Sequence, residues 1–151
     1  MTVERETERG MTVLKIIWIA MLASLAAYLV IGRLAAPNVP SSVNAKTFAS
    51  LRMALYAIGL VTLIAAGYVR RLMLGGINRF DGSTPAPRSA AIQKYTSAVI
   101  ISLALCESVG IYGLVLFLLG KHTLDLYLLL GISAAAMIYY RPNKEEMSPI
   151  P

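Results

Sequence analysis

Long stretches without charged residues constrain this chain more than any other feature of its sequence. Residues 16–32 and 53–69 carry no charge, and residues 95–120 carry only Glu107. Runs of about 18 or more apolar residues are typical of membrane-spanning helices. Charged residues make up 15% of the chain, whereas soluble domains contain about 25%. The pattern therefore predicts an all-α integral membrane protein.

Prolines and polar clusters divide the chain into four candidate membrane spans. We expect these spans at about residues 14–34, 50–73, 90–120 and 124–140. A secretory signal peptide is the alternative for the first span, but its apolar core covers about 7–15 residues. Here 17 uncharged residues are followed directly by Arg33, which favours a retained helix. The 151 residues thus predict one membrane domain, a four-helix bundle.

The positions of lysine and arginine predict how this bundle is oriented. With four spans, both termini and the loop after the second span share one side, which holds ten of the fourteen cations. By the positive-inside rule this side is cytoplasmic. We expect a multi-pass protein of the inner (cytoplasmic) membrane, with the lipid bilayer as its partner and these residues at the membrane interface: Arg70, Arg71, Tyr139, Tyr140 and Arg141. Because the cations flank apolar runs and form no basic face, the sequence argues against nucleic-acid binding.

Small residues along the third span predict a seam for close helix packing. Ala98, Ser102, Cys106 and Gly110 recur every four residues, and Gly113 lies just beyond. In lipid, such residues let helix backbones approach closely. We therefore expect the third helix to be central. Cys106 is the only cysteine, so the chain has no intrachain disulfide, and we expect this residue to serve packing.

Glu107 is the only formal charge between Lys94 and Lys121, and it lies at their midpoint. At 1.5 Å per residue it lies about 19 Å from either lysine, near the bilayer midplane. A charge there costs about 2.5–3.5 kcal/mol, and no lysine or arginine occurs at comparable depth in any span. Three options follow: a neutral carboxyl that hydrogen-bonds, a carboxyl that binds and releases a proton, or one that coordinates Na⁺.

Residues 104–115 read Ala-Leu-Cys-Glu-Ser-Val-Gly-Ile-Tyr-Gly-Leu-Val. This run resembles the carboxylate helix of subunit c, the rotor-ring subunit of F-type and V-type ATPases. The resemblance implies an ion site for H⁺ or Na⁺ that is formed by the side chains of Glu107, Ser108 and Tyr112 and by the carbonyl of Leu105. Oxygen ligands of this kind suit a hard cation. The whole chain resembles a four-span bacterial membrane protein.

The chain also departs from the subunit c pattern. The second span has no glutamine, residues 78–88 lack the Arg-Gln-Pro loop, and two further helices flank the hairpin. Three interpretations remain open: an ion-handling subunit of a homo-oligomer or larger membrane complex, a structural or accessory membrane protein in which Glu107 only hydrogen-bonds between helices, and a rotor-ring subunit.

Other functional classes find little support in the sequence. There is no nucleophile–histidine pairing, metal cluster or phosphate loop, which argues against an enzyme, a bound cofactor and any metal beyond Na⁺. His122 and Asp125 lie just outside the spans, and we expect both side chains to be solvated.

Overall fold

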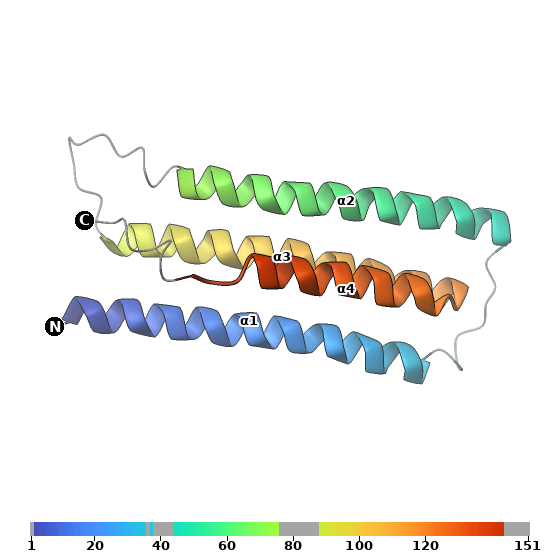
Figure 1. Cartoon of the computed structure of the whole chain (residues 1–151), viewed down its shortest axis with the longest axis horizontal. Coiled ribbons are helices and arrows are strands. Elements are labelled where there is room, and N and C mark those ends of the chain that lie inside the picture. The colour runs from blue at the N-terminus through green and yellow to red at the C-terminus, as the bar shows by residue number, and fades with distance from the viewer. Residues whose placement is uncertain (1, 36, 38–43, 76–87, 144–151) are drawn as a thin grey trace.

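The computed structural model of the protein describes residues 2–35, 37, 44–75 and 88–143, and these residues form four helices. The helices are α1 (Thr2–Ala35), α2 (Ala45–Gly75), α3 (Arg88–Gly120) and α4 (Thr123–Tyr139). Consecutive helices run in opposite directions, so α1 begins and α4 ends at the same end of the bundle (Figure 1). The prediction of an all-α fold is confirmed for the described residues.

The helices contain the apolar runs that predicted them, and most extend further. α1 begins at Thr2 rather than near residue 14, and α2 begins at Ala45 rather than near residue 50. Three helices are long and apolar enough to cross a membrane, over residues 10–35, 45–75 and 93–120. α4 is also apolar but has only 17 residues. Its bounds differ by one residue at each end from those we expected.

α3 is the central helix of the bundle. The other three helices all pack against it, and α1 also contacts α4. In Figure 1, α3 and α4 lie between α2 on one side and α1 on the other. The residues of α3 that are almost completely buried run along most of its length: Tyr95, Ala98, Val99, Ser102, Leu103, Cys106, Val109 and Leu116.

Two buried glycines of α3 bring its backbone close to its neighbours. A Cβ atom at Gly110 would lie 2.7 Å from a methyl carbon of Leu25 on α1. A Cβ atom at Gly113 would lie 2.9 Å from the Cβ of Leu129 on α4. Real Cβ atoms do not approach so closely. A larger residue at Gly110 would therefore displace the Leu25 side chain, and one at Gly113 would push α3 and α4 apart.

Two buried serines add hydrogen bonds to this packing. Ser133 of α4 donates from Oγ to the carbonyl of Cys106 at 2.6 Å, which joins α4 to α3. Ser102 donates to the Ala98 carbonyl of its own helix at 2.8 Å, and its Oγ lies 3.4 Å from the Ala66 carbonyl of α2. The seam of small residues on α3 therefore contacts α1, α2 and α4.

The connection between α3 and α4 consists of Lys121 and His122. Lys121 has φ 57°, in the left-handed region, and its backbone N–H donates to the Phe117 carbonyl at 2.8 Å. Phe48 at the start of α2 stacks on the His122 ring with centroids 5.5 Å apart. The short connection between α3 and α4 holds the first helical turn of α4 against α2. Asp125 lies in this first turn of α4.

Candidate functional site

Glu107 lies near the middle of the apolar part of α3, and its side chain reaches α1. Ser24 and Tyr28, one turn apart on α1, both donate a hydrogen bond to Glu107 Oε1. The Tyr28 hydroxyl oxygen lies 2.8 Å from that atom. All three side chains are partly buried. The carboxyl is thus held between two helices by hydroxyl groups, and these contacts include no lysine or arginine.

Ser24 has a second acceptor within reach. Its Oγ lies 2.7 Å from the Met21 carbonyl of its own helix. A serine hydroxyl has one hydrogen, so Ser24 cannot donate to Met21 and to Glu107 at the same time. If Glu107 is ionised, one of these two contacts has no hydrogen.

The residues that the subunit c resemblance implies do not converge on one point. Ser108 donates from Oγ to the carbonyl of Leu105 at 2.7 Å, a bond within α3 itself. The ring of Tyr112 packs beside Gly59 of α2, whereas Glu107 reaches α1. Five residues along a helix of 3.6 residues per turn separate two side chains by about 140°. The oxygens that contact Glu107 therefore come from α1.

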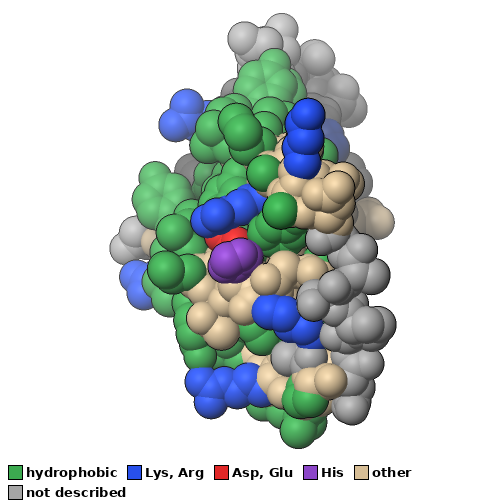
Figure 2. Space-filling model, turned by 90° about the vertical axis from the view of Figure 1, so that its right-hand side faces the viewer, with side chains coloured by type: hydrophobic (Ala, Val, Ile, Leu, Met, Phe, Trp, Pro, Cys, Tyr) green, Lys and Arg blue, Asp and Glu red, His purple; other side chains and the backbone are tan. Residues whose placement is uncertain are grey.

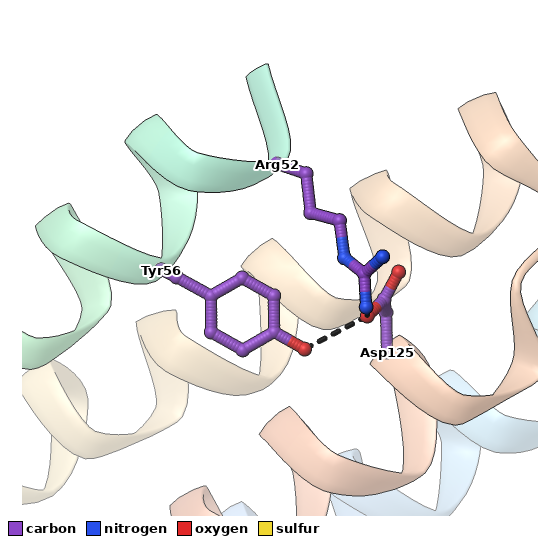
Figure 3. Close-up of polar contacts among 3 residues, drawn as sticks. All are labelled: Arg52, Tyr56 and Asp125. Atoms are coloured by element: carbon purple, nitrogen blue, oxygen red, sulfur yellow. Dashed lines mark hydrogen bonds and ion pairs between the residues drawn. The ribbon is translucent and has the colours of Figure 1, made fainter. Parts of the chain in front are cut away.

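The structure also contains a buried carboxylate, which differs from our expectation of a solvated side chain. Asp125 of α4 is 1% exposed. Its Oδ1 forms an ion pair with Arg52 Nη2 at 2.7 Å and accepts a hydrogen bond from the Tyr56 hydroxyl at 2.8 Å (Figure 3). Its Oδ2 is buried and has no hydrogen-bond partner. His122, three residues earlier, is exposed.

The sequence did contain a signal for this pair. Arg52 and Tyr56 are four residues apart, so they share one face of α2, and they lie at the end of the second span that adjoins Asp125. Figure 2 shows this end of the molecule, where separate lysine and arginine side chains surround a small acidic surface beside the histidine. Arg52 stays 47% exposed while it covers the aspartate.

The residues expected at the membrane interface lie at the opposite end of the bundle. Arg71, Tyr139 and Arg141 are exposed. Arg70 is only 7% exposed, because its Nη1 donates to the Tyr140 carbonyl at 2.7 Å and its guanidinium lies 5.4 Å from the centre of the Tyr140 ring. Arg70 therefore links the ends of α2 and α4.

Among the described residues, no group of three or more His, Cys, Asp and Glu side chains could hold a metal ion. Comparisons of the chain with protein-family models, with curated proteins and with solved structures found no match.

Proposed function

We propose that this chain is an integral membrane protein whose four helices all cross the bilayer, with both termini in the cytoplasm. Three helices have the required length and apolar character. α4 has 17 residues, which is the lower end of the range of about 17–25 for a spanning helix. Among the described residues, Lys15, Arg70, Arg71, Lys94 and Arg141 lie toward the same end of the bundle, which supports a cytoplasmic side there under the positive-inside rule.

Within this bundle, we infer that Glu107 binds and releases a proton. The observation that carries the inference is the position of Ser24 between two acceptors. A protonated Glu107 can donate to Ser24 Oγ, and Ser24 then donates to the Met21 carbonyl. Every hydrogen in this chain has one acceptor, and Tyr28 still donates to the carboxyl group.

The same hydroxyls also serve the ionised carboxylate. When Glu107 loses its proton, Ser24 rotates its hydrogen to Oε1, where Tyr28 already donates. The site therefore offers hydrogen bonds to both protonation states, which a group that only joins two helices does not need. Na⁺ is an alternative occupant, because the carboxylate, the two hydroxyls and the Met21 carbonyl are hard oxygen ligands.

A structural role for Glu107 is the second candidate function, and the Asp125 pair favours it. Tyr56 of α2 donates to Asp125 of α4, just as Tyr28 of α1 donates to Glu107 of α3. In this interpretation both carboxyls only attach outer helices to α3 and α4. Such bonds within membranes contribute about 0.6 kcal/mol on average and up to about 2.

Hydrophobic carbodiimides react with protonated buried carboxyls and would separate the two functions. For proton binding, we expect labelling of Glu107 in native membranes that falls as the pH rises, with no labelling of Glu107→Gln. Protection by Na⁺ at constant pH, absent with K⁺, would identify Na⁺ as an occupant. Labelling that ignores pH and Na⁺ would reject the proposal in favour of the structural role.

Infrared spectroscopy provides a second measurement at the same site. We expect a carbonyl stretching band from a protonated carboxyl that disappears in Glu107→Gln and shifts in Tyr28→Phe, because Tyr28 donates to this group. Asp125→Asn is the matched control and should leave the band in place. The oligomeric mass in detergent tests the rotor-ring interpretation, which a monomer or dimer would exclude.

A further inference from the structure

A groove of about 610 Å³ lies between α2 and the end of α4, at the end of the bundle opposite Asp125. It exists because α4 ends at Tyr139, while α2 continues past that level (Figure 1). Its volume falls within the range of about 300–1,000 Å³ that is typical of ligand sites. Three of its side chains are strongly exposed: Ile64 at 64%, Tyr68 at 65% and Tyr139 at 80%. The groove is therefore open to the surroundings along α2.

The lining of this groove is divided between apolar and polar groups. Leu63 and Ile64 line the part nearer the middle of α2. Arg71 and Tyr139 line the part at the helix ends, two turns of α2 further on. Gly67 lies between the two parts, and the absence of a side chain there lets the Tyr140 hydroxyl approach α2. The groove thus offers an apolar surface that leads to a cationic and phenolic rim.

The rim carries a positive charge. Among the residues that the structure describes, no aspartate or glutamate lines the groove to neutralise this charge. Arg70 is occupied by the Tyr140 carbonyl, whereas the Arg71 side chain is exposed. An arginine guanidinium binds phosphate through two parallel N–H···O bonds, and tyrosine hydroxyls are typical of the headgroup level of a membrane. A ligand that complements this groove has a phosphate at one end and a hydrocarbon chain at the other.

We propose that the groove binds one anionic phospholipid, with its phosphate at Arg71 and an acyl chain along Leu63 and Ile64. The proposal rests on the membrane placement proposed above and is independent of the protonation of Glu107. That placement puts the groove in the cytoplasmic leaflet, where anionic lipids are concentrated. A lipid there would fill the space beyond the end of α4 and support the short helix.

The test uses the full chain purified in neutral detergent, with native mass spectrometry during titration by phosphatidylglycerol or phosphatidylcholine. We expect preferential binding of phosphatidylglycerol. Arg71→Gln should weaken it about fivefold, which corresponds to the roughly 1 kcal/mol of one cation near an anionic surface. Arg71→Lys keeps the charge, and its affinity for phosphatidylglycerol should lie between that of the original protein and that of Arg71→Gln. Arg141 is exposed at the same end of the bundle and is not among the residues that line the groove. Arg141→Gln is therefore the matched control and should bind phosphatidylglycerol as the original protein does.

A photoreactive phosphatidylglycerol locates the bound molecule. We expect cross-links on α2 near Ile64 and Arg71 and on α4 near Tyr139. Equal losses in Arg71→Gln and Arg141→Gln, no preference between the two lipids, or cross-links elsewhere would each overturn the proposal. A dimer that forms without lipid and is lost in Arg71→Gln would assign the groove to a second copy instead. A chain that stays in solution without detergent would reject the membrane placement itself, which separates that failure from a failure of lipid binding.

Discussion

Replacing Arg52 should destabilise the protein much more than neutralising its partner Asp125. The two side chains differ in burial, because Arg52 is 47% exposed whereas Asp125 is 1% exposed. In Arg52→Gln, the aspartate stays buried and keeps the hydrogen bond from Tyr56, while its Oδ2 has no hydrogen-bond partner among the described residues. In Asp125→Asn, the amide oxygen still accepts a hydrogen bond from Tyr56, and the Arg52 side chain can reorient toward the solvent.

The expected magnitudes follow from this asymmetry. An exposed ion pair contributes about 0–1 kcal/mol, and removing one partner of a buried pair costs about 3–5 kcal/mol. With one partner buried and the other half exposed, Arg52→Gln should cost about 2–3 kcal/mol. Asp125→Asn should cost no more than about 1 kcal/mol. In the double variant no charge is buried, so Asp125→Asn should rescue most of the loss caused by Arg52→Gln.

Unfolding by sodium dodecyl sulfate in mixed micelles, followed by circular dichroism, measures these differences. Lys46→Gln, an exposed cation at the same end of the bundle, is the control and should be nearly neutral. Equal losses in the two single variants would contradict the reasoning, as would a double variant that loses the sum of both. Either result would mean that Asp125 is not held as a buried charge by Arg52.

Three further predictions concern the packing around α3. Gly113→Ala should cost about 1–3 kcal/mol in the same unfolding assay, because its Cβ would lie 2.9 Å from Leu129 Cβ; Gly131→Ala, with nothing within 4 Å, should be neutral or slightly stabilising. Ser133→Ala should cost about 0.6–2 kcal/mol through loss of the bond to the Cys106 carbonyl, and a neutral result would show that this bond contributes nothing. Cys106 is fully buried, so a maleimide should label its thiol only as the protein unfolds; rapid labelling of the folded protein would contradict the packing described for α3.

The helices could be predicted from the sequence because each is an apolar run bounded by cations or prolines. The depth of Glu107 along α3 could also be estimated, since this residue lies midway between Lys94 and Lys121. The partners of Glu107 could not be predicted, because they depend on how α1 is rotated against α3. The subunit c resemblance led to Ser108, but a serine in a helix readily bonds to a carbonyl of its own helix. Ser108 does so with Leu105.

The burial of Asp125 could not be predicted for a related reason. Its position just after the loop predicts a solvated side chain, but Arg52 and Tyr56 of α2 contact it in the folded bundle. The pair Arg52 and Tyr56, four residues apart, was a usable signal, since two polar groups on one face at the start of a membrane span need a partner. Such an argument identifies the face but not the helix that meets it.

The two carboxyls, Glu107 and Asp125, differ in the charge of their contacts, and under the proposed function this difference lets Glu107 but not Asp125 exchange a proton. Each accepts a hydrogen bond from a tyrosine of an outer helix, Tyr28 for Glu107 and Tyr56 for Asp125. Asp125 lies near the end of the bundle, where Arg52 can extend from the surface and supply a positive charge. At the depth of Glu107 the contacts among the described residues are neutral hydroxyls, so under the proposed function a proton or a cation supplies that charge. Placing a lysine at Ser24 would add the missing cation; we expect Ser24→Lys to abolish carbodiimide labelling of Glu107, and persistent labelling would show that the carboxyl does not need it.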